Sequence, residues 1–269
     1  MNFPPSSLRR LERSRGEAHV RMKLQSGTTR LADLCQQGSA KAILPRGVGT
    51  PEVVFLNTSG GLTGGDRLDL SLALDDGCQA VATTQTAERA YDSGGSEAVV
   101  TIRHSVGQGG WLDWLPQETI LYDGSSVTRS TEIALTGRAG CLLLEMVVLG
   151  RAAMGETVGR LAFTDRRSVL RDGVPVLTDP LSFGDEASAA VPGGARAFAT
   201  LAMVGPGAEE TLAVARGALD ILGVEATASA FDGTLVVRML SHDGWPLRRQ
   251  VAKVLNAMRG RSLPRVWQI

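Results

Sequence analysis

Short segments in which apolar and polar residues alternate constrain this chain most. Leucine occupies every second position from 68 to 74, and Val20, Met22 and Leu24 show the same alternation near the start. A period of two is typical of a β-strand that buries one face. Many of the 32 glycines stand between such segments, and glycine readily adopts the positive φ angles of tight turns. The sequence therefore predicts many short strands joined by turns.

Several turns are marked by an Asp-Gly pair. Asp172-Gly173 lies between two strand-like segments, and Asp232-Gly233 precedes another alternating segment. Asp-Gly between two strands favours a type I′ hairpin. Asp76-Gly77 and Asp123-Gly124 predict two further turns.

Two segments in the last quarter show helical periodicity instead. The first, 208–222, has Glu209 and Glu210 in its first turn, where the helix dipole favours negative charge, and is followed by Gly223. The second begins at Pro246 and ends at Gly260. The apolar stripes consist of Leu212, Ala215, Leu219 and Leu222 in the first segment and Leu247, Val251, Val254, Leu255 and Met258 in the second.

Composition narrows the class of protein. The 28 basic and 28 acidic residues cancel, whereas a nucleic-acid-binding protein usually has a basic excess, so protein or small-molecule partners are expected. No run of about 18 apolar residues predicts a membrane span, and residues 1–16 lack the apolar core of a secretory signal. Three widely spaced cysteines favour reduced thiols in the cytoplasm. No linker is evident, so a single domain, 1–269, is expected, with 191–194 (VPGG) as a candidate mobile loop.

A glycine-rich segment, 60–66 (GGLTGGD), is the most unusual part of the chain. Gly60 and Gly65 bracket four residues, as in a Walker A loop, but Asp66 and Arg67 stand where that motif has Lys and Ser or Thr. A strand rather than a helix is predicted to follow. Nucleotide binding is therefore a minor alternative, and a tight turn that presents Asp66 is favoured.

Two carboxylates stand out by their position. Glu145 lies inside the apolar segment 142–149, and a buried carboxylate is costly unless it is paired or bound to a cation. Arg151 is a candidate partner for it. Glu118 follows Pro116 at a predicted strand end. A carbohydrate-active β protein that uses Glu118 and Glu145 as paired carboxylates is the main alternative function.

Histidine and tryptophan add less specific signals. The three histidines, His19, His104 and His242, are too far apart for a shared metal site on one element, so no tight metal site is expected. Trp111 and Trp114 are either core residues of a strand or contacts for a protein partner.

Taken together, several segments resemble the UreD (UreH) family of urease accessory proteins. These segments, in chain order, are Arg30-Leu31 with Gln36–Gly38, Gly60–Asp66 (GGLTGGD), Thr83–Gln85 with Tyr91, Trp114–Glu118 (WLPQE) with Tyr122–Gly124, Glu145 with Gly150-Arg151 and Gly155-Glu156, and Leu263–Trp267. Their order and spacing agree with the family over nearly the whole chain. The chain departs from the family at Gln85, where proline is common, and at Ala90, where phenylalanine is common.

The resemblance implies a mainly β fold, β-helix-like or sandwich-like, with two α-helices near the C-terminus. It implies no catalytic turnover and no tightly bound cofactor. The implied partners are UreF, the GTPase UreG and the urease structural subunits, and the implied cargo is transient Ni²⁺.

A divalent ion cannot cross a dry β core without ligands, so the resemblance leads us to expect a carboxylate-lined internal passage. The candidate nickel ligands are Asp66, Glu118, Glu145 and Glu156. The motif residues with expected structural roles are Gly60, Gly61, Gly64, Gly65, Thr83, Thr84 and Arg151. The candidate partner contacts are Trp111, Trp114 and Trp267.

Overall fold

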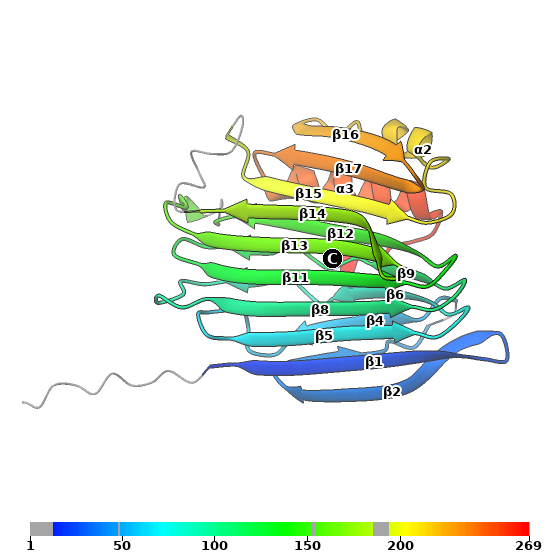
Figure 1. Cartoon of the computed structure of the whole chain (residues 1–269). Helices are drawn as coiled ribbons and strands as arrows, with labels where there is room; N and C mark the ends of the chain where they lie inside the picture. Colours follow the sequence, from blue (N-terminus) through cyan, green and yellow to red (C-terminus); the bar gives the residue numbers. More distant parts are fainter. Residues whose placement is uncertain (1–12, 48, 152–153, 185–193, 269) are drawn as a thin grey trace, which may run out of the picture.

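The chain folds into two β-sheets that face each other, with helices on the outer side of one of them (Figure 1). The computed structural model describes residues 13–47, 49–151, 154–184 and 194–268. Sheet A consists, in spatial order, of β14 (Val174–Phe183), β13 (Ala162–Arg171), β11 (Ser126–Leu135), β8 (Ala98–Val106), β5 (Arg67–Leu74), β1 (Arg15–Gln25) and β2 (Thr28–Gly38). Sheet B consists of β16 (Val224–Phe231), β17 (Thr234–Ser241), β15 (Ala197–Val204), β12 (Gly140–Leu149), β9 (Trp111–Trp114), β6 (Gln79–Thr84), β4 (Glu52–Asn57) and β3 (Ala40–Ile43), joined at one side by β10 (Thr119–Leu121) and β7 (Glu88–Ala90).

The centre of the molecule is a parallel β-solenoid. From β4 to β13 the long strands alternate between the two sheets, so that each pair of strands completes one turn of a coil. Strands β5, β8, β11 and β13 are parallel neighbours in sheet A, and β4, β6, β9 and β12 are parallel neighbours in sheet B. Antiparallel strands extend both ends of this coil. The expectation of a mainly β fold is confirmed, and of its two alternatives, β-helix-like or sandwich-like, the solenoid corresponds to the first.

Two predicted hairpins have the expected turn geometry. Asp172 and Gly173 have φ angles of 50° and 81°, and Asp232 and Gly233 have φ angles of 48° and 69°. Positive φ at both central residues defines the type I′ turn, whose twist matches that of the flanking strands. The turns connect β13 to β14 and β16 to β17 as antiparallel pairs.

The alternating segments bury the faces that the sequence predicts. The four leucines of β5 and the residues Val20 and Met22 of β1 point into the space between the sheets. Leu24 is 47% exposed because it lies next to the turn of the β1–β2 hairpin. A second apolar cluster lies between the outer face of sheet B and the helices.

The second predicted helix is present, and the first is much shorter than predicted. Helix α3 (Gly244–Arg259) is capped by Asp243, which accepts the amide hydrogen of Trp245 (2.9 Å), and by Gly260 at φ 59°. Its predicted stripe is buried, except for the half-buried Met258. Helix α2 spans only Leu212–Gly217.

Three sequence predictions in the 208–222 segment are therefore wrong. Glu209 and Glu210 precede the helix, and Leu222 is 96% exposed. Gln250 of α3 ends helical bonding here, because its side chain donates to the Ala218 carbonyl (2.7 Å) and accepts the Ile221 amide hydrogen (2.8 Å). Neither helix, in the part of the chain that is described, is long and apolar enough to cross a membrane. Most of the predicted 191–194 loop lies outside the described residues.

Candidate functional site

Glu145 lies on β12 and points into the space between the sheets, where its side chain is 2% exposed. Its partner is Arg129 on β11 of the opposite sheet, whose Nη2 lies 2.5 Å from Glu145 Oε2. The predicted pairing with Arg151 is wrong, because Arg151 binds Glu156 (2.8 Å) and stacks over the Tyr122 ring (4.5 Å).

The Glu145–Arg129 pair is the inner end of a row of alternating charges. Arg129 also donates hydrogen bonds to Asp165 from Nε (3.0 Å) and Nη2 (2.8 Å). Arg167 then lies between Asp165 (3.4 Å) and Asp179 (3.0 Å), and the exposed Arg238 binds Asp179 (2.6 Å). The row, hereafter the charge row, contains three arginines and three carboxylates and runs from β12 to the edge strand β14 and across to β17.

Burial and ion pairing act in opposite directions on the pKa values at the inner end. Burial raises the pKa of Glu145 above its ordinary value, and the nearby Arg129 guanidinium opposes this shift. For Arg129, burial lowers the pKa, but attraction to Asp165 and Glu145 is larger, so its pKa is raised and it stays charged. Glu145 Oε1 is buried and has no hydrogen-bond partner among the described residues.

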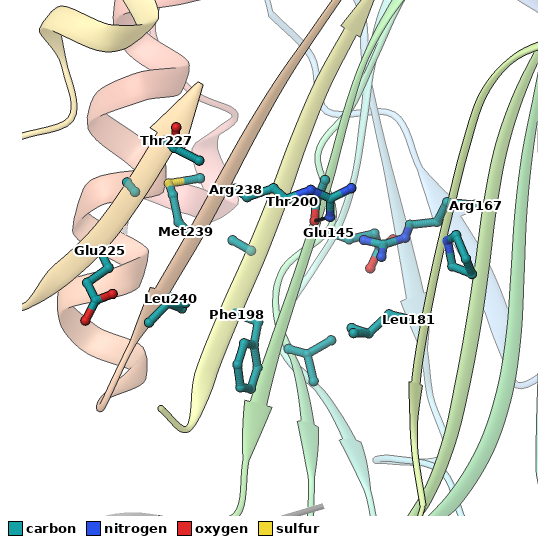
Figure 2. Close-up of a pocket in the computed structure, with 14 residues that line it drawn as sticks. Glu145, Arg167, Leu181, Phe198, Thr200, Glu225, Thr227, Arg238, Met239 and Leu240 are labelled. Carbon is teal, nitrogen blue, oxygen red and sulfur yellow. Dashed lines mark hydrogen bonds between the residues drawn. The ribbon is translucent and has the colours of Figure 1, made fainter. Parts of the chain in front are cut away.

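Three cavities are related by the lining residues that they share, and two of them share Glu145. The edge cavity, about 400 Å³, lies between β14 and strands β15–β17, with Glu145 and Arg167 at one end and Glu225 at the other (Figure 2). The central cavity, about 50 Å³, shares Glu145 with the edge cavity and is also lined by Arg129. The loop cavity, about 90 Å³, shares Thr84 and Glu88 with the central cavity and reaches the glycine-rich loop at Gly60 and Gly61.

Glu88 is a second carboxylate of these cavities, and no pattern in the sequence pointed to it. It lies on β7, where its Oε1 accepts a hydrogen bond from Asn57 Nδ2 (3.3 Å). Burial raises its pKa to about 7. By contrast, the sequence does carry a signal for Arg129, which the sequence predictions missed. Arg129 stands between Val127 and Thr131 at a position where the alternation of the strand calls for an inward-facing residue.

The other three candidate nickel ligands do not meet Glu145, since none of them lines any of the three cavities. Asp66 is buried and accepts the amide hydrogens of Ser14 (2.7 Å) and Thr63 (2.9 Å). Glu118 pairs with Arg248 (2.8 Å). Within the described ranges, no cluster of three or more His, Cys, Asp or Glu side chains is suited to hold a metal ion.

Glu156, the last of these candidates, stabilises a loop. It accepts hydrogen bonds from the amides of Arg151 (2.8 Å) and Asp123 (3.3 Å). The hydrogen bond from the Arg151 side chain lowers the pKa of Glu156, so the carboxylate stays ionised and held in place.

The glycine-rich segment is a close-packed turn between β4 and β5. Gly60, Gly61 and Gly65 have positive φ angles. A Cβ on Gly64 would lie 2.1 Å from the Ser93 carbonyl oxygen, and one on Gly61 would lie 2.4 Å from the Tyr91 ring. The strand β5 follows directly, so the helix that a Walker A loop requires is missing.

The Thr-Thr pair connects the cavities to the C-terminal segment. Thr83 Oγ1 donates to the Leu115 carbonyl (2.6 Å), which also accepts from Trp267 Nε1 (3.1 Å). Thr84 Oγ1 accepts the Gln117 amide hydrogen (2.9 Å) while its side chain lines the central and loop cavities. These contacts hold the WLPQE segment in place beside the cavities.

Two of the three candidate partner tryptophans are core residues. Trp114 is fully buried and packs on His104 (4.6 Å between ring centroids), and Trp267 is 6% exposed. Their rings are therefore not on the surface of this structure, where a partner could contact them directly. Trp111 is half-buried, with its Nε1 donating to Asp113 (2.7 Å), and stays a candidate.

The carbohydrate-active alternative gains no support from this geometry. Glu118 lines neither of the two cavities that Glu145 lines, and each carboxylate is neutralised by its own arginine. Paired carboxylates of a glycosidase must face one substrate-sized space.

Comparisons with known proteins agree with the motifs. The family described as UreD urease accessory protein matches residues 14–268. Urease accessory protein UreD of a Cereibacter sphaeroides strain is 64% identical over 264 residues, which is 96% of each chain. The proteins of the same name from Paracoccus denitrificans and Rhizobium etli are 52% and 41% identical, covering 97% of this chain and 94% and 97% of theirs. The chain therefore belongs to the UreD family of urease accessory proteins.

Proposed function

We propose that this chain is a non-catalytic scaffold that delivers Ni²⁺ to apo-urease through an internal passage. In this proposal the passage consists of the edge, central and loop cavities, and the nickel ion is the cargo. The chain acts in a cytoplasmic complex with UreF, the GTPase UreG and the urease structural subunits. Free thiols at all three cysteines support a reducing compartment.

The observation that carries the proposal is that neighbouring cavities share a carboxylate, the buried Glu145 in one case and the half-buried Glu88 in the other. Glu145 stands between the edge and central cavities, and Glu88 stands between the central and loop cavities. A cation that moves along this route meets an oxygen ligand at each junction. Carboxylate oxygens are ligands that a divalent transition metal accepts.

The scarcity of ligands suits transport rather than storage. Desolvating a divalent ion without ligands is prohibitive, yet a site with many ligands would retain it. One carboxylate at each junction favours weak binding. A dissociation constant in the micromolar range corresponds to a binding free energy of about 8 kcal/mol. Such an ion is held long enough to be passed on and is released without an added energy source.

The two ends of the passage suggest where partners dock. The edge cavity opens between β14 and β16, which are the terminal strands of their sheets. The loop cavity opens beside Gly60, Gly61 and the 84–89 segment. A donor and an acceptor of nickel that cover these two openings would keep the ion inside protein throughout its transfer.

The test is urease activation in cells that carry the urease genes and Glu145→Gln or Glu88→Gln. We expect each substitution to lower both urease activity and the nickel content of purified urease. Glu132→Gln, which changes an exposed carboxylate on β11, is the matched control and should leave both unchanged. Co-purification of the partners should be unaffected in all three variants.

Full nickel loading of urease with both Glu88 and Glu145 replaced would refute the passage. Loss of the complex itself would instead assign these residues a structural role. Deleting the whole chain tests the wider proposal, because urease should then be made without nickel.

A further inference from the structure

Arg129 lines the central cavity, where the proposed passage is most confined. The residue is 7% exposed, and this cavity is the smallest of the three. Its Nη1 donates to Thr119 Oγ1 (2.9 Å), and its guanidinium carbon lies 5.6 Å from the centre of the Phe163 ring. A fixed positive charge at this point acts directly on any cation that reaches Glu145.

We infer that Arg129 sets the affinity of the passage for its cargo: it competes with the metal ion for Glu145 and so keeps the binding of divalent cations weak. This inference rests on the proposed function. It concerns how strongly the passage holds its cargo, whereas the proposed function concerns whether the cargo travels there.

The charge balance around Glu145 supports competition. The three arginines of the charge row are matched by its three carboxylates. A divalent ion at Glu145 would therefore meet no excess negative charge from the charge row and would face the Arg129 guanidinium at close range. Like charges repel strongly in a buried site, because the low polarity there screens them little.

The geometry also lets Arg129 release Glu145 without losing all its partners. Asp165 is fully buried and holds Arg129 by two hydrogen bonds, and Thr119 holds a third nitrogen. Glu145 contributes a single contact, and its other oxygen has no partner among the described residues. A small shift of the guanidinium toward Asp165 would free Glu145 for a metal ion.

The test is nickel titration of the full-length chain in competition with a colorimetric chelator. The central variant, Arg129→Gln with Asp165→Asn, keeps the net charge of the protein and the hydrogen-bonding ability of both positions. We expect it to bind Ni²⁺ about tenfold tighter or more than the wild type, because the repelling charge has gone. Adding Glu145→Gln to this pair should return the affinity to the wild-type value.

Two further variants separate charge from structure. Arg129→Lys keeps the positive charge and should stay within about threefold of the wild-type affinity, although it lacks the guanidinium fork. Arg103→Gln with Asp69→Asn removes an exposed ion pair of similar length (2.9 Å) and should have no effect. If the central variant melts more than about 10 °C below the wild type, Arg129→Met with Asp165→Leu replaces it, because apolar substitution of a buried ion pair is often tolerated.

Unchanged or weaker Ni²⁺ binding by the folded charge-neutral variants would overturn the inference. So would tighter binding that persists when Glu145→Gln is added. The urease assay keeps the two proposals apart. Normal activation with both Glu88→Gln and Glu145→Gln refutes the passage whatever the titration shows. Lost activation in that double variant, together with unchanged affinity in the Arg129 variants, overturns only the role of Arg129.

Discussion

At the scale of single residues, the interior of this β-solenoid is unusual for the charges that it buries. Arg129, Glu145, Asp165 and Arg167 each take an inward-facing strand position that would ordinarily be apolar. Burying an ion is costly, and the cost is offset only if a partner of opposite charge is buried with it. The charge row satisfies this condition by alternating the signs of its members across neighbouring strands.

Glu88 differs because no ion pair accompanies it among the described residues, and its titration should therefore affect stability. Burial raises the pKa of its carboxyl from 4.5 to about 7, so the folded state binds the proton more tightly than the unfolded state. The contribution of this tighter proton binding to the free energy of unfolding is fully present below pH about 4.5 and is lost as pH rises through about 7.

We expect Glu88→Gln to gain about 1–3 kcal/mol of stability relative to the wild type between pH 5 and pH 8, since glutamine does not titrate. Urea unfolding at a series of pH values measures this difference. A difference between the two proteins that stays constant with pH would show that Glu88 is ionised throughout.

At the scale of secondary-structure elements, the C-terminal helix is attached to sheet B by a buried cluster. Asp113 on β9 is 1% exposed and binds Arg259 (2.8 Å) and Arg261 (2.6 Å), which lie at the end of α3 and just beyond it. The same carboxylate accepts from Trp111. One buried acid thus fixes the end of a helix to a strand almost 150 residues earlier in the chain.

Replacing Asp113 by asparagine should destabilise the protein by about 3 kcal/mol or more, because Arg259 would be left buried without a counter-charge. The matched control is Asp220→Asn, which removes an exposed ion pair with Lys253 and should cost about 0.5 kcal/mol or less. Thermal unfolding of the two variants gives the comparison, and equal losses would contradict the argument.

The glycine-rich turn offers a second test at this scale. Gly64→Ala places a methyl group against the backbone oxygens of Ser93 and Ser96, which cannot move without shifting the neighbouring loop. We expect a loss of about 2 kcal/mol or more. Gly217→Ala, at the end of α2 and in open space, should be neutral or stabilising by up to about 1 kcal/mol. Measured free energies of unfolding that rank the two variants in the opposite order would contradict the packing described for the turn.

At the scale of the whole molecule, the edge cavity exists because the two sheets do not match in extent. Sheet B continues past β14 through β17 and β16, so that part of its inner face has no opposing strand and forms one wall of the edge cavity (Figure 1). The two prolines of β14, at 175 and 180, lack amide hydrogens and suit an edge strand that must not pair further. The opening is thus part of the fold.

A steric block should therefore act like the loss of a ligand. Thr200 lines the edge cavity and is the β15 neighbour of Glu145, so Thr200→Phe would place a ring at the inner end of that cavity. We expect Thr200→Phe to lower the nickel content of urease several-fold relative to the wild type, while the complex with the partners still forms. Thr227→Phe, on the exposed rim at β16, is the control. Equal nickel content in both variants would argue that the ion does not pass through the edge cavity.

Local patterns in the sequence determined much of this protein without the structure. Alternation located the strands, Asp-Gly pairs located two hairpins, and the Pro246–Gly260 periodicity located α3 almost to the residue. Each of these depends on interactions between residues close in sequence, which leave a readable period. The family motifs, which are also local, led to the correct family, and the buried Glu145 was found because a charge interrupts an apolar run.

Which side chains face the same space became clear from the folded chain alone. Glu88 and Glu145 line the same cavity, and Arg129 rather than Arg151 neutralises Glu145. The other candidate carboxylates bind loops and a helix elsewhere; they are Asp66, Glu118 and Glu156. Gln250 likewise shortens α2 from a distance. Charges and hydrogen bonds act through space over a few ångströms, and in a solenoid each turn brings together residues some thirty or more positions apart. No spacing along the chain records those pairings.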